Sequence, residues 1–418
     1  MEDWLGGITC LLLKTYLKEE EILNNLYVGI DVSKESASAQ GLDATGRKSF
    51  YLKFKMDSDG FSELLETIMT HCKEKTKVMV AMESTACYHV NLFSFLISKG
   101  INAIIINPLL ISNFSKLALR KTKTDKKDAL VIAQFLLTQK DSLAQHAISS
   151  EMADLRDIAR QRESLVDQMT AIKHEIKQLL TMTFPELEGI VGLFTKSMLR
   201  LLCKHPSAAA IESTSHCDIA EILIPGSMGR NTTDTVKAIK QAAGRSVGTT
   251  RAAREMIIKQ KASILVHLDE HLQQITSVLI EHCQSIMQED IEVLRSIKGI
   301  GDKTAINFLV EMGGDITLFA NHKKLIATAG LDPSVCQSGK YEGISKISKR
   351  GNRHLRRVIW LMATKVIIFN DFFKSYFTKR KKEGLPYKKA VLATAHKLIR
   401  IIFAMLSNKT LFTANASS

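Results

Sequence analysis

The sequence predicts an α/β domain with a mixed sheet, followed by a mainly helical region. Between Leu26 and Ile106, short apolar runs alternate with amphipathic stretches, which is the pattern of strands alternating with helices. Beyond Asp125 the apolar residues recur at helical spacing almost throughout. The length of 418 residues is enough for about two or three domains.

Local patterns place the elements of the first domain. Strands are marked by β-branched residues or by alternation, and helices by apolar residues three and four apart. The predicted strands are 27–32, 49–54, 78–82 and 101–106, and the predicted helices are 61–71 and 92–99.

Two heptad seams mark long helices in the second region. The first seam consists of Leu155, Ile158, Arg162, Leu165, Met169, Ile172, Ile176 and Leu179. The second consists of Leu265, Leu268, Leu272, Ile275 and Leu279. Such stripes form the contact surface of coiled coils. The two helices can therefore pack as an antiparallel hairpin within one chain or across a dimer, and an ordinary bundle core has the same pattern.

The charge of the chain indicates a polyanionic partner. There are 57 lysines and arginines against 43 aspartates and glutamates, which gives a formal net charge of +14. Nucleic acid is the first candidate for the partner, and an acidic membrane surface is the second. With 45% hydrophobic and 24% charged residues, the composition excludes collagen-like and wholly disordered proteins.

No segment predicts a membrane span or a secreted protein. The longest apolar run, 101–111, is interrupted by two asparagines and a proline, and a bilayer span needs about 20 residues. The apolar stretch 4–13 follows two acidic residues, where a signal peptide carries positive charge. The seven cysteines never form a C-x-x-C pair, so no disulfide framework or zinc knuckle is expected. We expect a cytoplasmic protein.

Four carboxylates lie at positions where they can converge. Asp31 ends the first strand, Glu83 follows the strand 78–82, and Asp125 and Asp128 are three residues apart at a helix start. Taken singly, each of these acids is more simply explained as a turn or helix-cap residue than as a metal ligand. Together, in a basic protein, they need a cation. Hard oxygen ligands suit Mg²⁺, with two ions about 4 Å apart and Mn²⁺ as a substitute.

One other class of α/β protein shares part of this pattern. In actin-like ATPases and sugar kinases the first strand also ends in G-I-D. Such proteins need a Gly-rich phosphate loop in a later domain, and no such loop follows a strand between 128 and 294. The sequence therefore favours metal-dependent phosphodiester chemistry over nucleotide hydrolysis.

Basic residues beside these carboxylates are candidates for phosphate contacts. Between 116 and 127 there are six lysines and arginines and one acid, a composition that otherwise marks a solvated face. Beside a metal site, a basic run is typical of a surface that positions nucleic-acid phosphates. The residues that we expect to contact nucleic acid here are Lys121, Lys123, Lys126 and Lys127.

A glycine-rich turn at 297–301 resembles the hairpin of a helix-hairpin-helix. Gly299 and Gly301 permit a tight turn, and the backbone N–H groups at the start of the next helix, with Lys303, can hold a DNA phosphate. The alternative is a plain glycine turn between two helices.

The last constellation combines serines with a basic run. From 337 to 360 there are seven lysines and arginines and one acid. A serine in a Gly-containing loop among cations has an accessible hydroxyl and groups that stabilise a phosphorane-like transition state. Chemistry alone does not choose among Ser338, Ser345 and Ser348. The residues expected to contact nucleic acid are Lys340, Lys349, Arg350, Asn352, Arg353, Arg356 and Arg357.

Several short motifs occur in a specific order. They are G-I-D-V-S-K at 29–34, M-E-S-T-A at 82–86, K-T-D-K-K-D-A at 123–129, the I-x-G-I-G turn, and A-G-L-D-P, S-G-K and I-S-K-R-G-N-x-x-L-R-R near the C-terminus. In identity and order they resemble the transposases of the insertion-sequence one-hundred-ten family. The resemblance extends from about Tyr27 to about Ala404.

That resemblance implies a division into domains. The expected parts are an extension at 1–25, a RuvC-like domain of the RNase H fold at 26–145, a helical coiled-coil region at 146–290, a C-terminal transposase domain at 291–405 and a tail at 406–418.

The resemblance also implies roles for particular residues. It implies that a DEDD tetrad binds metal, formed by Asp31, Glu83, Asp125 and Asp128. It implies a serine nucleophile in the C-terminal domain, which the motif places at Ser338, with Ser348 as the second choice. It further implies recombination between donor and target DNA under guidance from a structured non-coding RNA, in a prokaryotic cell. We also expect a homo-oligomer, a dimer or a tetramer, because recombination cuts several strands.

Two enzymatic hypotheses follow. In the first, a recombinase attacks DNA with Ser338 and holds a covalent phosphoserine. In the second, a RuvC-type junction resolvase or nuclease hydrolyses DNA with water at the carboxylates, and the C-terminal domain only binds. A basic, non-enzymatic DNA binder is a third class, which leaves the four acids unexplained.

Overall fold

The computed structural model describes most of the chain, in two compact units. The described residues are 25–83, 88–106, 111, 114, 125–143, 150–225, 227, 229–334, 337–338, 341–342 and 346–413. The first unit lies within 1–148 and the second within 149–418. The extension predicted at 1–25 lies almost wholly outside the described residues. The domain boundary predicted near residue 290 remains a prediction.

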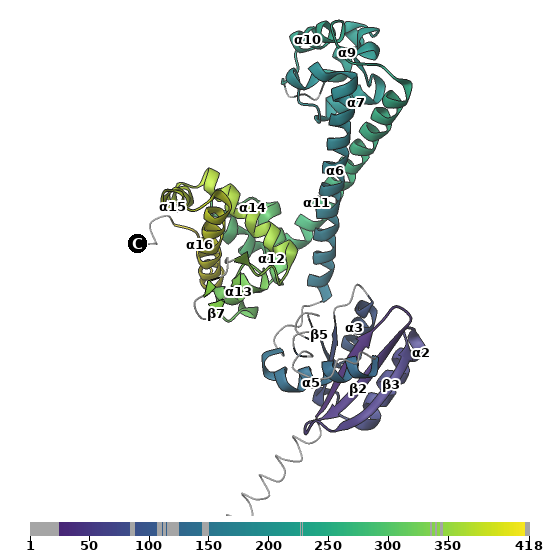
Figure 1. The fold of residues 1–418 in the computed structure, drawn as a ribbon, viewed down its shortest axis with the longest axis vertical. Helices are drawn as coiled ribbons and strands as arrows, with labels where there is room; N and C mark the ends of the chain where they lie inside the picture. The colour runs from purple at the N-terminus through teal and green to yellow at the C-terminus, as the bar shows by residue number, and fades with distance from the viewer. Residues whose placement is uncertain are drawn as a thin grey trace, which may run out of the picture. The chain divides into compact units, whose positions relative to one another are not determined.

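The first unit is built on a five-stranded mixed sheet, which confirms the predicted α/β domain (Figure 1). The strands are β1 (Leu26–Val32), β2 (Ser36–Asp43), β3 (Lys48–Lys55), β4 (Val78–Glu83) and β5 (Asn102–Ile106). The order is β3-β2-β1-β4-β5, with β1 antiparallel to β2 and parallel to β4. The helices are α2 (Ser58–His71), α3 (His89–Ser98) and α5 (Asp125–Leu143).

Each face of the sheet has its own hydrophobic core. Val28 of β1 packs with Leu64 of α2 and Leu92 of α3 on one face. Tyr27, the next residue toward the N-terminus, packs with Ile132 of α5 on the other face. Because helices cover both faces, β1 and β4 are apolar along most of their length, as the sequence indicates.

Strand β2 has no counterpart among the strands that the sequence pattern predicts. Its sequence, Ser-Ala-Ser-Ala-Gln-Gly-Leu-Asp, lacks the β-branched and aromatic residues that mark a strand. In the structure β2 lies between β1 and β3 and packs against α5, while Ala37 and Ala39 contribute to the core beneath α2 and α3. Small side chains here allow close packing on both faces of β2. Because small residues have a low propensity for strands, the sequence does not mark this segment as a strand.

The second unit contains a long helical hairpin. Its arms are α6 (Ser150–Thr183) and α11 (Ala252–Arg295), which run antiparallel (Figure 1). Between them are four short helices that pack around the far end of the hairpin in a shared core. These are α7 (Lys196–Lys204), α8 (Ala208–Glu212), α9 (His216–Leu223) and α10 (Thr233–Ala243).

The first heptad seam faces α11 of the same chain. Leu165, Met169 and Ile176 are buried, and Arg162 Nε donates a hydrogen bond of 3.0 Å to Thr276 Oγ1 on α11. Of the arrangements that the sequence leaves open, the structure therefore has the internal hairpin. A true coiled coil remains a prediction.

The C-terminal part of the second unit is a group of five helices with a small hairpin. The helices are α12 (Asp302–Met312), α13 (His322–Thr328), α14 (Arg353–Phe369), α15 (Asp371–Lys382) and α16 (Tyr387–Asn408). By length and composition α16 could cross a membrane, but 50% of its apolar window is buried inside the unit. Leu398 and Ile399 are fully buried, which is the pattern of a core helix.

Candidate active site

Helix α5 lies directly on strand β1 at Gly29. A Cβ atom at Gly29 would lie 2.2 Å from the backbone nitrogen of Ala133 and 2.4 Å from the carbonyl oxygen of Ala129. Both neighbours are backbone atoms, which cannot move aside without moving the helix. The close approach of helix and strand therefore requires glycine at this position.

Helix α5 runs antiparallel to β1. Leu137, in the C-terminal half of α5, lies 3.6 Å from the Cβ position of Gly46, in the turn between β2 and β3. That turn lies beside the start of β1, because Leu26 pairs with Asp43. The N-terminal end of α5 therefore lies toward the carboxyl end of β1.

Asp31 and Glu83 occupy neighbouring positions on β1 and β4. In the parallel pairing of these strands Ile30 is opposite Met82, and the next step of the same register sets Asp31 opposite Glu83. Neighbouring strands are about 4.8 Å apart. Asp31 is two residues beyond Gly29, so it belongs to the face of the sheet that α5 covers. Both acidic residues are half-buried.

The same geometry brings Asp31 toward the first turn of α5. Two strand residues advance about 6.6 Å and one helical residue about 1.5 Å, so Asp31 lies opposite a part of α5 about one turn before the contact with Gly29. That part includes Asp125, the first residue of α5, and the half-buried Asp128. The side chain of Asp125 lies outside the described residues. Among the side chains that are described, no three of His, Cys, Asp or Glu lie close enough together to hold a metal ion.

The lysines predicted near these acids are only partly described. Lys126 and Lys127 are exposed, and Lys126 Nζ lies 4.8 Å from the ring centre of Tyr51 on β3. Lys121 and Lys123 lie outside the described residues.

Ser338 lies near the tip of a β-hairpin in the second unit. At its base β6 (Pro333–Ser334) pairs with β9 (Lys346–Ile347), and further out β7 (Gln337–Ser338) pairs with β8 (Tyr341–Glu342), both antiparallel. Ser338 is opposite Tyr341. The two residues between them, Gly339 and Lys340, lie outside the described residues, as does the side chain of Ser338. Ser338 and Tyr341 therefore form the outermost described pair of the hairpin.

Ser348 lies at the base of the same hairpin, where its hydroxyl is engaged. Ser348 Oγ donates a hydrogen bond of 2.6 Å to Asp332 Oδ1, and its backbone N–H donates to the Asp332 carbonyl at 2.8 Å. The hydroxyl also accepts from the backbone N–H of Arg350 at 3.3 Å. Ser348 therefore joins the two sides of the hairpin base.

The chain segments around this base are in close contact. A Cβ atom at Gly351 would lie 2.3 Å from the carbonyl oxygen of Thr328, and Gly330 has a φ of +63°. Lys349 has a φ of 54°, which is uncommon for a residue other than glycine. The backbone N–H of Asn352 donates to the Thr328 carbonyl at 2.7 Å. These contacts fix the base from which the hairpin projects.

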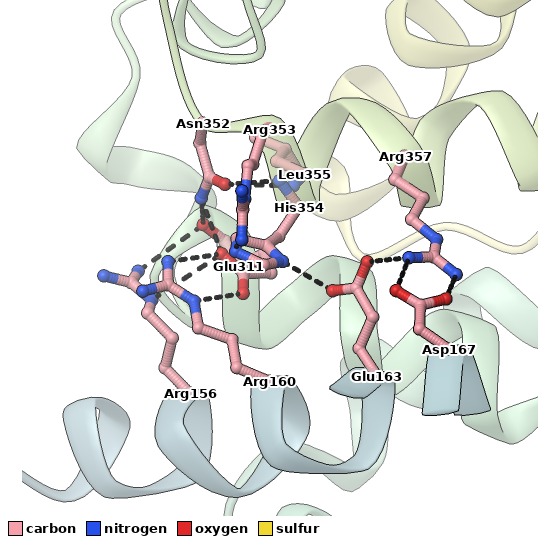
Figure 2. Close-up of polar contacts among 10 residues, drawn as sticks. All are labelled: Arg156, Arg160, Glu163, Asp167, Glu311, Asn352, Arg353, His354, Leu355 and Arg357. Carbon is pink, nitrogen blue, oxygen red and sulfur yellow. Dashed lines mark hydrogen bonds and ion pairs between the residues drawn. The ribbon is translucent and has the colours of Figure 1, made fainter. Parts of the chain in front are cut away.

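A buried carboxylate joins the turn after the hairpin to helix α6 (Figure 2). Glu311 of α12 is 4% exposed. It accepts hydrogen bonds from Arg160 Nε at 2.9 Å, Arg160 Nη2 at 3.1 Å and Asn352 Nδ2 at 2.6 Å. Burial raises the pKa of Glu311, but the hydrogen bonds from Arg160 and Asn352 outweigh burial and hold this pKa below its ordinary value. Asn352 also caps α14 through the N–H groups of His354 and Leu355.

A second row of ion pairs continues this contact along α6 and α14. Arg357 donates to the two oxygens of Asp167 at 2.6 and 2.7 Å and pairs with Glu163 at 2.7 Å. His354 Nδ1 lies 2.5 Å from Glu163 Oε2. The hydrogen bond with Arg357 lowers the pKa of Asp167. Glu311 and the α6 acids belong to no motif, so the sequence pattern does not mark them as functional residues.

The structure gives the C-terminal cations different surroundings. Arg356 Nη1 donates to the Ala329 carbonyl at 2.8 Å, and Asn352 and Arg357 are engaged as described above. Lys349, Arg350 and Arg353 are exposed.

In the glycine turn, Gly299 has a φ of +106° and packs on α14, whereas a Cβ at Gly301 would meet nothing within 4 Å. Lys303 is exposed. Phosphate binding at this turn remains a prediction.

Comparison with known families identifies the class of protein. A family model of DEDD transposases, described as Transposase, matches residues 28–185. A second model, described as Transposase IS116/IS110/IS902 family, matches residues 291–378. The chain is a transposase, an enzyme that recombines DNA. It belongs to the IS110 family of insertion-sequence transposases, which confirms the resemblance seen in its motifs.

Similar proteins extend over nearly the whole chain. The chain is 26% identical to the insertion element IS116 uncharacterized 44.8 kDa protein of Streptomyces clavuligerus, over 93% of this chain and 96% of that protein. It is 24% identical to the pilin gene-inverting protein of Moraxella bovis, over 92% of this chain and 96% of that protein. The transposase for IS1111A of Coxiella burnetii is 33% identical over a shorter part, 31% of this chain and 36% of that protein.

Proposed function

We propose that this transposase cuts and rejoins DNA through a covalent phosphoserine at Ser338. The observation that carries the proposal is the hairpin, which has Ser338 in its outermost described pair and a base fixed by close contacts. Attack on phosphorus requires an oxygen held in line with the leaving group. The hydroxyl of Ser348 is bonded within the hairpin base, which favours Ser338 of the two serines.

The proposed step conserves the number of phosphate ester bonds. Ser338 Oγ forms a bond to a DNA phosphorus, the bond from phosphorus to one DNA oxygen breaks, and the serine proton ends on the released hydroxyl. The same step in reverse, with the hydroxyl of another strand end, joins that strand and restores the serine. The exposed guanidinium groups of Arg350 and Arg353 are available to pair with phosphate oxygens.

We further propose that the four acids hold divalent cations, Mg²⁺ with Mn²⁺ as a substitute. Support comes from the register that sets Asp31 beside Glu83 and from the direction of α5, which brings Asp125 and Asp128 toward them. Carboxylate oxygens are the ligands that Mg²⁺ prefers. When bound, the ions neutralise charge on the attacking and leaving oxygens of phosphodiester chemistry.

Guidance by RNA and self-association complete the proposal. RNA guidance rests on the family resemblance, and self-association rests on the need to cut several strands. RNA recovered with the purified protein and sequenced should contain a structured non-coding transcript of the same element. Light scattering should show at least a dimer on nucleic acid. Because the seam of α6 is covered by α11, we expect contacts between protomers to lie outside it.

The experiment that tests the nucleophile uses end-labelled DNA incubated with the protein and Mg²⁺. We expect a covalent protein–DNA adduct that survives denaturation, and mass spectrometry should locate the phosphate on Ser338. Strand cleavage without any adduct would instead favour the RuvC-type resolvase, in which water is the nucleophile.

A further inference from the structure

A cluster of cations surrounds the turn between α15 and α16, outside all the motifs considered above. The two helices lie side by side in the C-terminal group (Figure 1). Between residues 374 and 389 there are seven lysines and arginines and one acid. The lysines of this cluster are Lys374, Lys379, Lys381, Lys382, Lys388 and Lys389.

Ion pairs within the described parts of the chain do not engage these six lysines. The one acid, Glu383, pairs with Arg380 at 2.8 Å, and the Arg380 guanidinium also lies over the ring of Tyr376. No ion pair to any of the six lysines occurs among the described residues, and all six are exposed.

The helix dipole does not account for the whole cluster. Cations in the last turn of α15 are favourable, because the C-terminal end of a helix is negative. Lys388 and Lys389, however, lie in the first turn of α16, where the dipole disfavours positive charge. Their position therefore costs stability within the free protein, and an external anion would remove that cost.

A half-buried lysine lies beside the same excess of positive charge. Lys397 of α16 lies over the rings of Phe372 and Tyr376. Burial lowers the pKa of Lys397, and the nearby charges of Arg400, Arg380 and Lys379 lower this pKa further.

The surface beside the cluster carries phosphate-binding groups and an exposed ring. An open depression of about 820 Å³ along α15 is lined by Asp371, Lys374, Ser375, Thr378, Lys379, Lys382 and Glu383. Its lysines and hydroxyls are donors to phosphate oxygens. Tyr387 is 55% exposed, with its ring edge-on to Phe377 at 5.7 Å between centres. An exposed aromatic ring among lysines is suited to stack on an unpaired base.

We propose that the α15–α16 turn binds a single-stranded segment of nucleic acid, with the lysines on its phosphates and Tyr387 on a base. The proposal rests on the proposed function only for the presence of nucleic acid in the reaction. Single-stranded DNA and RNA offer the same phosphates and base faces, so the test compares them directly. A duplex hides its base faces in the stack and is expected to lose the contribution of Tyr387.

The test measures binding by fluorescence anisotropy, using the full-length Ser338→Ala protein so that no adduct forms. The probes are labelled oligothymidylate and oligouridylate of about 16 nucleotides, and a duplex of the first with its complement. One variant changes Lys379, Lys381 and Lys382 to Gln. Its matched control changes Lys204, Lys237 and Lys259 to Gln at the far end of the α6–α11 hairpin, with the same loss of net charge.

We expect the α15 triple variant, but not the control, to weaken single-strand binding and to reduce the slope of log K against log salt by about 2. Tyr387→Ala should weaken single-strand binding about 5- to 100-fold and Tyr387→Phe should not. A preference for oligouridylate over oligothymidylate would identify RNA as the source, and the reverse would identify DNA. Equal effects of the two triple variants, or a Tyr387→Ala loss no larger on the single strand than on the duplex, would overturn the proposal. A failed adduct assay with intact effects here would overturn only the serine mechanism.

Discussion

The hydroxyl of Ser348 and the carboxylate of Asp332 are joined by a hydrogen bond of 2.6 Å across the base of the hairpin that carries Ser338. The two serines are ten residues apart in one motif-rich segment, and their surroundings differ. Ser348 holds the hairpin base closed, whereas Ser338 lies in the outermost described pair of the hairpin. The same substitution at the two positions should therefore have different consequences.

Ser338→Ala should eliminate both the covalent adduct and recombination, while binding and folding change little. Ser348→Ala should still form the adduct, at a reduced rate, because the hairpin base loosens but the nucleophile remains. Loss of the bond to Asp332 should cost about 1 kcal/mol of the free energy of unfolding. Denaturing gels measure the adduct, and urea unfolding measures the stability.

The opposite result would place the nucleophile ten residues downstream. If Ser348→Ala abolishes the adduct and Ser338→Ala does not, the assignment from the motif is wrong. If both single variants remain fully active, neither serine is the nucleophile.

Glu311→Gln should destabilise the second unit by about 3 kcal/mol, because it leaves the guanidinium of Arg160 without its buried carboxylate. The matched control is Asp167→Asn, in the exposed row of the same contact. There the side chain is 57% exposed, so we expect about 1 kcal/mol or less. Urea unfolding of the two variants makes the comparison, and equal losses would argue against a central role for Glu311.

The same carboxylate predicts a dependence of stability on pH. The pKa of Glu311 is lower in the folded protein than its ordinary value, so its contribution is complete above the ordinary pKa. It is lost as the pH falls through the folded pKa. The unfolding free energy of the wild type should therefore decline in acid more than that of Glu311→Gln. Parallel curves for the two proteins would contradict this.

Much of the first unit could be predicted from the sequence, because burial on both faces makes β1 and β4 apolar along most of their length. β2 could not, since the packing that it needs favours alanine, serine and glycine, which are poor markers of strands. The direction of α5 could not be predicted either. It depends on the contact between Gly29 and Ala133, which are more than 100 residues apart.

The residues of the candidate site also divide into those that the sequence could predict and those that it could not. Asp31, Glu83, Asp125 and Asp128 could be predicted as candidates because each belongs to a short motif at an end of an element. Arg357 was predicted to bind nucleic acid from a basic run, and in the structure it pairs with Asp167 and Glu163 on α6. A local charge count cannot find partners that lie about 190 residues away.

Gly29→Ala should destabilise the first unit by about 1–3 kcal/mol and reduce strand cleavage. The added methyl group would meet the backbone of α5 and push it away from β1, which carries Asp31. Gly189→Ala is the control, because a Cβ atom there meets nothing within 4 Å. Thermal unfolding and cleavage per folded molecule give the two readouts. Unchanged cleavage with a lowered melting temperature would show that the position of α5 is not critical for the reaction.

Asp31→Asn and Asp125→Asn should each abolish strand cleavage and leave nucleic-acid binding intact or slightly stronger. Their charge is proposed to bind metal, and removing a negative charge reduces repulsion of the phosphates. Glu66→Gln is the control, since Glu66 is exposed on α2, which packs on the opposite face of the sheet. Cleavage in Mg²⁺ and binding in anisotropy are measured side by side.

Removal of the metal tests the same assignment without mutation. Chelation should stop cleavage by the wild type, and added Mg²⁺ or Mn²⁺ should restore it. The Asn variants should not recover at any metal concentration that saturates the wild type, because replacing a carboxylate by an amide removes an anionic ligand from the site. Full recovery of Asp31→Asn at high Mg²⁺ would mean that this residue tunes affinity and is not essential. Normal cleavage by either variant in ordinary Mg²⁺ would show that the metal site lies elsewhere.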